Sequence, residues 1–141
     1  LENTVRVVPF QPDDELSPMF AEADVLLLNQ ISAVTDTVIP SKLLTYMAAG
    51  RPVLAAVNPA SEAAQLLRTS DAGVLVTPED PEALAAAARW FATADPDVLA
   101  AFSARNRAYA EQHFDQRKIL PAHEEFILDT MRARLRPEPA S

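Results

Sequence analysis

The stretch Pro40-Ser41-Lys42-Leu43-Leu44-Thr45-Tyr46-Met47-Ala48-Ala49-Gly50-Arg51-Pro52-Val53-Leu54-Ala55 predicts a helix that is followed directly by a strand. Pro40 has a fixed φ and no N–H to lose, which suits the first helical position, and Ser41 can accept from the free amides of the first turn. Gly50 supplies the left-handed conformation that closes a helix. The apolar stripe of this helix is Leu43, Leu44, Met47 and Ala48, and the apolar run 53–57 predicts a strand covered on both faces.

The front of this helix predicts a phosphate site. Its first N–H groups have no partner within the helix, and they carry the positive end of the helix dipole. Lys42 adds a full positive charge there, which is unfavourable for the dipole unless an anion is bound. Ser41 alone indicates less, because a serine caps helices in any α/β protein.

The same residues carry a resemblance to a known family. Residues 38–42, VIPSK, and 46–53, YMAAGRPV, resemble the donor-binding signature of the family-4 glycosyltransferases of the GT-B fold. The branch that builds bacterial exopolysaccharide and O-antigen is the most similar. Residues 23–28, ADVLLL, and 72–78, AGVLVTP, extend the resemblance on both sides in the family's own order.

The chain departs from the family pattern where most members carry a pair of glutamates. Thr37 and Thr45 stand at those positions, and Asp36 is the nearest carboxylate that could substitute. In the family the first glutamate contacts the donor sugar and the second contacts the ribose, so the departure bears on the donor more than on the class. Each of the three residues also has a plain structural interpretation, as a loop cap or a helix-surface group. The predicted donor- and phosphate-binding residues are Ser41, Lys42, Leu43, Thr45, Asp36 and Thr37.

Composition narrows the class of protein. The chain has 141 residues, a net charge of −8 and no cysteine, which argues against a broad nucleic-acid surface and excludes disulfides and cysteine-based zinc sites. It contains neither a long apolar run nor a basic-then-apolar signal pattern at its start. Its two glycines, Gly50 and Gly73, both follow predicted helices, so no glycine-rich phosphate loop is left.

Strands and helices are expected to alternate along the chain. The first strand is Val5–Val8, and a helix then starts at the Ser17–Pro18 pair, with Asp13, Asp14 and Glu15 as a solvated approach. The further expected strands are 25–28, 53–57 and 73–77, and the further helices are 61–70, 80–92, 98–114 and 116–135. Trp90 and Phe91 are expected in the core, and the tail 136–141 is expected to fray.

The expected fold is therefore α/β, a partial Rossmann-like parallel sheet of about four strands, with helices on both faces and a helical C-terminal segment. The resemblance implies that residues 1–141 form one domain, a donor-binding lobe that lacks its first two strand–helix units and the N-terminal acceptor-binding lobe. Such a fragment is expected to be inactive alone. Removal of its central strand would also expose apolar edges.

The resemblance implies retaining transfer of a sugar from a UDP- or GDP-linked donor to a glycan or lipid-linked acceptor in bacterial polysaccharide synthesis. It implies no cofactor, no metal, no nucleic-acid partner and a cytoplasmic location, and it allows peripheral association with the inner face of the plasma membrane through the missing lobe. The residues themselves show no nucleophile–base pair, and His113 and His123 lie in no ligand cluster. A non-catalytic module that binds nucleotide sugars or a partner, and another GT-B enzyme such as a nucleotide-sugar epimerase, remain the alternatives.

Overall fold

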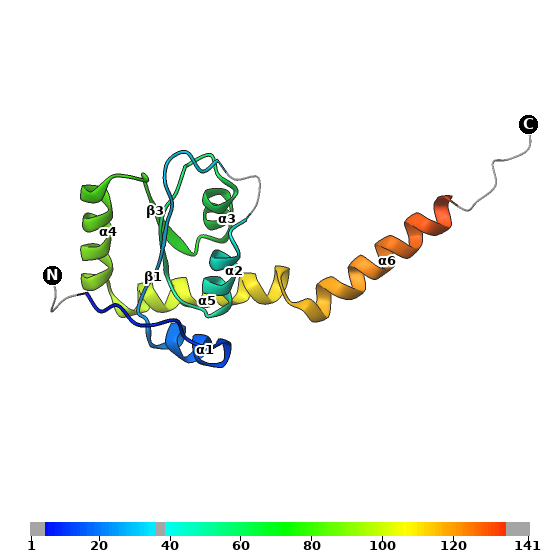
Figure 1. Ribbon diagram of the computed structural model, residues 1–141, viewed down its shortest axis with the longest axis horizontal. Helices are drawn as coiled ribbons and strands as arrows, with labels where there is room; N and C mark the ends of the chain where they lie inside the picture. Colours follow the sequence, from blue (N-terminus) through cyan, green and yellow to red (C-terminus); the bar gives the residue numbers. More distant parts are fainter. Residues whose placement is uncertain (1–4, 36–38, 135–141) are drawn as a thin grey trace, which may run out of the picture.

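A parallel sheet with helices on its two faces forms the body of the protein (Figure 1). The computed structural model describes residues 5–35 and 39–134. Their elements are α1 (Asp13–Glu22), β1 (Leu26–Asn29), α2 (Ser41–Ala48), β2 (Val53–Ala56), α3 (Glu62–Ser70), β3 (Gly73–Val76), α4 (Pro81–Thr93), α5 (Pro96–His113) and α6 (Gln116–Arg134). The α/β class and the parallel sheet are confirmed, and the described residues form three strands.

The strand order is β1-β2-β3, so β2 lies at the centre of the sheet. Leu26 is opposite Val53, and Val53 is opposite Gly73. Val53 belongs to the core shared with α2 and α3, whereas Leu54 packs with Phe91 of α4 on the other face. Both faces of β2 are therefore covered, as its apolar run predicts.

The two glycines meet different requirements. Gly50 follows α2 with a φ of 64°, as predicted for a residue that closes a helix. The same prediction for Gly73 is wrong, because Asp71 is the left-handed residue at the end of α3, with a φ of 47°, and Gly73 begins β3. A Cβ atom on Gly73 would lie 2.5 Å from the carbonyl oxygen of Val53. The close approach of β3 to β2 thus requires glycine at this position.

We expect Gly73→Ala to destabilise the protein more than Gly50→Ala. The Cβ at position 50 would meet the Cβ of Arg107 at an ordinary 3.4 Å, so its main cost is the left-handed backbone, about 1–2 kcal/mol. At position 73 two strands must separate, which costs about 3 kcal/mol or more, as in a strongly overpacked core. Urea unfolding of both variants measures the difference, and the reverse order would contradict this account of Gly73.

Asn106 of α5 holds the two segments that lead into β2 and β3. Its side chain is fully buried, and its Nδ2 donates to the carbonyl oxygens of Arg51 and Ala72, each at 2.7 Å. Those carbonyls lie just before the central and the third strand. One buried amide group therefore joins α5 to both strand entrances, and its burial makes the two bonds costly to lose.

The residues on either side of Asn106 fasten the ends of two helices. Arg107 donates to the carbonyl of Ala48 at the end of α2, at 2.8 Å. Arg105 donates to the carbonyl of Asp71 at the end of α3. Cations suit these positions because the last carbonyls of a helix are unsatisfied and carry the negative end of the dipole. Through three consecutive residues, α5 fixes how α2 and α3 lie on the sheet.

Two expectations for the first residues are wrong. Val5–Val8 forms no strand, and Val7 is 91% exposed, because the segment does not pair with any described strand. The first helix begins at Asp13, not at Ser17, and Pro18 lies inside it. The acidic run is thus part of the first helical turn, where negative charge favours the helix dipole.

The aromatic pair on α4 divides between core and surface. Phe91 is buried, as expected, but Trp90 is 42% exposed, so its predicted place in the core is wrong. Trp90 packs edge-on against Phe91, with ring centroids 4.9 Å apart, and against Phe102 of α5 at 6.2 Å. Its ring covers the outer side of the small core between α4 and α5.

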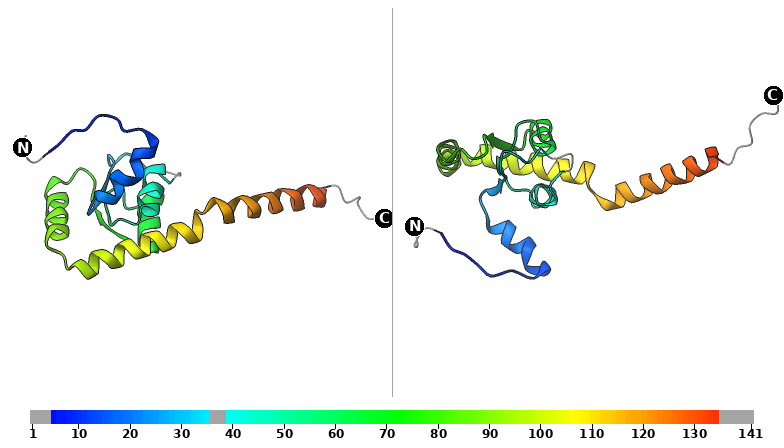
Figure 2. Two further views of the ribbon diagram at one scale, coloured as in Figure 1. Left: turned by 90° about the horizontal axis from the view of Figure 1, so that it is seen from below. Right: turned by 45° about the horizontal axis from the view of Figure 1, so that its top comes forward.

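Helix α6 extends away from the sheet (Figure 2). It runs from Gln116 to Arg134 with Pro121 inside it, and none of its residues is buried. The predicted last residue of this helix, Leu135, and the tail 136–141 lie outside the described residues. Its exposed apolar side chains are Leu120, Phe126, Ile127, Leu128 and Met131.

The outer edge of β1 is open. The amide of Leu26 donates to the carbonyl of Pro52, just before β2, and the amide of Gln30 donates to that of Ala56 in β2, each at 2.9 Å, so the backbone groups of Leu27 point the other way. No described strand pairs with them, and the Leu27 carbonyl accepts only a long bond, 3.4 Å, from the Tyr46 hydroxyl. Burial raises the pKa of this hydroxyl. The side chain of Leu27 is 47% exposed.

We expect residues 1–141 alone to self-associate through this edge, since unpaired strand edges and exposed apolar faces promote association. Leu27→Lys places a charge beside the edge and should shift sedimentation-velocity profiles toward monomer. Leu120→Lys on α6 is the matched control for a helix-mediated contact. A concentration-independent monomer that melts above about 65 °C, the top of the usual mesophile range, would contradict the prediction and favour a complete domain.

Candidate functional site

The loops that follow the three strands lie at one edge of the sheet, at the top of Figure 1. Because the strands are parallel, their carboxyl ends meet there, and α2 begins where the loop after β1 ends. In open parallel α/β sheets ligands bind outside the carboxyl ends of the strands. The predicted donor-binding residues on α2 belong to this edge.

The start of α2 is open to solvent. Pro40 is the N-cap, one position earlier in the helix than predicted, and it provides no side-chain hydrogen bond. Ser41 and Lys42 are exposed. The first-turn amide of Leu43 donates to the carbonyl of Pro40 at 2.9 Å. The amides of Ser41 and Lys42, which have no partner among the described residues, are left as backbone donors without a side-chain cap, an arrangement that suits an anion.

Lys42 has no ion-pair partner among residues 5–35 and 39–134. Lys118, in contrast, donates to the carbonyl of Glu111 at 2.6 Å. With respect to these described residues, the ammonium group of Lys42 is left to meet a ligand. Its position beside the positive end of the helix dipole favours a ligand with negative charge.

Leu43 and Thr45 differ from the other predicted site residues. The Leu43 side chain is fully buried in the core, and its amide already donates to the Pro40 carbonyl, so its predicted ligand contact has no free donor. Thr45 is exposed, but its hydroxyl donates to the carbonyl of Ser41 at 3.1 Å, within its own helix. Thr45 also lines a hollow between α2 and α1 with Ser17 and Phe20. Asp36 and Thr37 lie outside the described residues.

A set of contacts that was not predicted joins the three loops. The backbone N–H of Ser32, after β1, donates to Glu79 Oε2 at 3.1 Å. The carbonyl of the same residue accepts from Asn58 Nδ2, after β2, at 2.9 Å. The hydrogen bonds from Ser32 hold the pKa of the Glu79 carboxyl below its usual value. The available sequence signal was an acidic residue two positions after the predicted strand 73–77.

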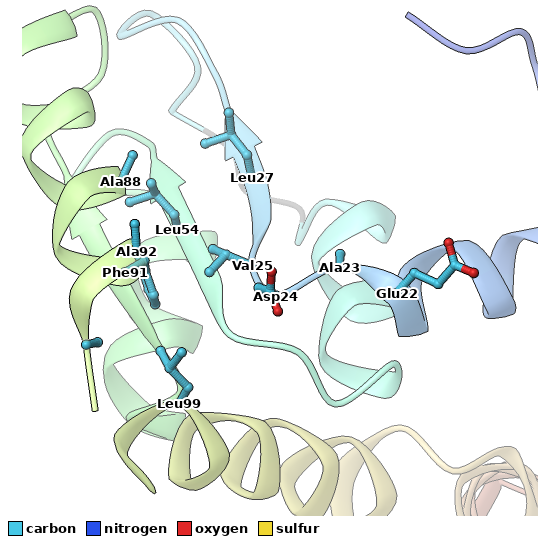
Figure 3. Close-up of a pocket in the computed structure, with 11 residues that line it drawn as sticks. Glu22, Ala23, Asp24, Val25, Leu27, Leu54, Ala88, Phe91, Ala92 and Leu99 are labelled. Atoms are coloured by element: carbon cyan, nitrogen blue, oxygen red, sulfur yellow. The ribbon is translucent and has the colours of Figure 1, made fainter. Parts of the chain in front are cut away.

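A larger hollow lies elsewhere, beside β1 and α4 (Figure 3). Its volume is about 660 Å³, and Val25, Leu27, Leu54 and Phe91 make it mainly apolar. It opens next to the unpaired edge of β1, away from the start of α2. Its apolar lining does not suit a diphosphate, and we assign the candidate site to the α2 edge of the sheet.

The described residues offer little independent reaction chemistry. Across 5–35 and 39–134, no group of three or more His, Cys, Asp or Glu residues could hold a metal ion. His113 and His123 are exposed on α5 and α6, and the first packs on the ring of Tyr109 at 4.2 Å. No described helix has both the length and the apolar character needed to cross a membrane. What the site can do is bind an anionic group.

Comparison with known proteins defines the class. The family model described as Glycosyl transferases group 1 matches residues 1–93, so the chain belongs to this family. The predicted resemblance to glycosyltransferases of bacterial exopolysaccharide synthesis is confirmed. No solved structure matches the chain significantly.

Three relatives of the chain are named as glycosyltransferases of bacterial polysaccharide synthesis. The chain is 34% identical over 121 residues to a protein of Salmonella typhimurium named as the colanic acid biosynthesis glycosyltransferase WcaL. The aligned residues cover 84% of this chain and 29% of the relative. It is 33% identical to the protein of the same name in Escherichia coli K12, with the same coverage. It is 32% identical over 118 residues to the amylovoran biosynthesis glycosyltransferase AmsK of Erwinia amylovora, covering 82% of this chain and 28% of the relative. The chain thus spans less than a third of the length of these relatives.

Thr45→Val tests the predicted ribose contact. Because the Thr45 hydroxyl is already bonded to the Ser41 carbonyl, we expect its removal to weaken nucleotide binding by about 1 kcal/mol or less, the worth of one neutral hydrogen bond. Isothermal titration of the full-length protein with UDP and GDP measures this effect. A hundredfold loss of affinity would show that Thr45 binds the nucleotide directly.

Proposed function

We propose that the protein containing this chain is a glycosyltransferase that transfers a sugar from a UDP- or GDP-linked donor, and that the front of α2 binds the donor diphosphate. The observation that carries the proposal is Lys42, exposed and without an ion-pair partner in the described part of the chain, at an uncapped helix start on the carboxyl edge of a parallel sheet. Family membership supports the reaction class. The acceptor, a glycan or a lipid-linked glycan, is proposed from the polysaccharide syntheses for which the relatives are named.

The proposed mechanism assigns this chain to the leaving group. When the glycosyl bond to the diphosphate breaks, negative charge develops on the phosphate oxygens. The Lys42 ammonium and the first-turn amides of α2 would stabilise that charge more strongly in the transition state than in the bound donor. We propose retention at the sugar carbon and no metal, as the family resemblance implies. A GT-B architecture, with the acceptor bound by a second lobe, belongs to the same proposal.

Lys42→Ala in the full-length protein should weaken binding of UDP or GDP by about 1.5–3 kcal/mol, the range for a hydrogen bond to a charged group. Isothermal titration measures the change. The matched control is Lys118→Ala, because that lysine of α6 bonds the Glu111 carbonyl of α5, and it should leave the affinity unchanged. Equal affinities for wild type and Lys42→Ala would overturn the phosphate assignment.

The same measurements separate the alternatives. A protein that binds nucleotide sugars, loses this binding with Lys42→Ala and transfers no sugar to any glycan acceptor would be a binding module. Conversion of the nucleotide sugar without an acceptor would favour an epimerase. The cytoplasmic location and the peripheral membrane association that the resemblance implies remain predictions, which fractionation of cells producing the full-length protein would test.

A further inference from the structure

We infer that Glu79 is a positioning residue for donor binding, because with Asn58 it fixes Ser32 in the loop after β1, at the edge of the sheet where α2 begins. The inference rests on the proposed function of α2. Three strands contribute to this contact. Ser32 follows β1, Asn58 follows β2 and Glu79 follows β3.

Both backbone polar groups of Ser32 are bonded to side chains from other loops. Its N–H donates to Glu79 Oε2 at 3.1 Å, and its carbonyl accepts from Asn58 Nδ2 at 2.9 Å. The residues after Ser32 are folded into a tight turn, in which the amide of Val34 donates to the carbonyl of Ile31 at 3.1 Å. Glu79 and Asn58 therefore hold the first part of the loop in one conformation.

The Asn58 side chain and the backbone on either side of Glu79 are held by further contacts. Asn58 Oδ1 accepts from the amide of Ala60 at 2.9 Å, which orients the amide group that bonds Ser32. Glu79 lies between Pro78, which is buried, and Asp80, whose side chain caps α4 by accepting from the amide of Ala83 at 2.9 Å. The loop after β1 is thus attached to supports that belong to the sheet and to α4.

The backbone of Glu79 is unfavourable for its residue type. Its φ is 61°, in the left-handed region where glycine has no steric penalty and glutamate has one. Strained residues of this kind persist where the surrounding structure determines them, and they cluster at ligand sites. Here the glutamate provides a carboxylate for Ser32, which glycine could not do.

The direction of the electrostatic effect makes the inference testable. A carboxylate near a diphosphate repels it, so removing an ordinary surface glutamate from this edge would leave donor affinity unchanged or raise it. If Glu79 positions the loop, its removal must instead lower the affinity, because the loop then loses part of its order before binding. The two interpretations thus predict changes in donor affinity of opposite sign when Glu79 is removed.

The experiment compares Glu79→Gly, Glu79→Gln and Glu82→Gln with the wild-type full-length protein. Glu79→Gly removes the contact with Ser32 but relieves the backbone, so its melting temperature should be unchanged or higher. We expect its Kd for UDP-glucose or GDP-mannose, whichever the wild type binds, to rise about three- to tenfold, the effect of one net hydrogen bond. Glu79→Gln keeps an acceptor oxygen for the Ser32 amide and should bind nearly as the wild type does.

Glu82→Gln is the matched control, because Glu82 is an exposed carboxylate in the first turn of α4, and its affinity should equal that of the wild type. An unchanged or tighter Kd in Glu79→Gly would overturn the inference, as would a weaker Kd that is accompanied by a lower melting temperature. A wild type that binds nucleotides while Glu79→Gly binds equally well leaves the proposed function intact. Failure of the wild type to bind UDP, GDP or their sugars would overturn both.

Discussion

The buried amide of Asn106 is the interaction on which the arrangement of the sheet and its helices depends. Its two hydrogen bonds reach the carbonyls of Arg51 and Ala72, and so fix the entrances of β2 and β3 against α5. Because the side chain is fully buried, water cannot replace these bonds. The flanking Arg105 and Arg107 bind the ends of α3 and α2. The position of the whole of α2, including its open start, therefore depends on α5.

The amino and carboxyl ends of the strands are organised by different means. At the amino ends of β2 and β3, one helix joins the connections through buried and half-buried bonds. At the carboxyl ends, the loops are joined to one another by exposed bonds between Ser32, Asn58 and Glu79. Exposed bonds contribute little to stability and exchange readily with water. This division suits a binding site, where a rigid scaffold carries the loops that meet a ligand.

The open edge of β1 and the exposed faces of α6 fit a chain that spans less than a third of its relatives. On β1 the side chain of Leu27 is exposed beside the apolar hollow next to α4, whereas the residues of β2 are all buried. In the family resemblance, this is the side on which further strands belong. The segment Val5–Val8, which its strand propensity predicted to be a strand, pairs with no described strand.

The sequence by itself determined the alternation of strands and helices and the place of the candidate site. Ser61 and Asp80, the first residues of two helical ranges predicted from the sequence, cap those helices, and the Pro40-Ser41-Lys42 stretch indicated both α2 and the family. These features are local, because caps and apolar periods act within a few residues. Only the tertiary structure decided that Gly73 is required by the carbonyl of Val53, that Trp90 lies at the surface and that Glu79 meets Ser32. Each of these depends on residues far apart in the chain, whose contact no local pattern records.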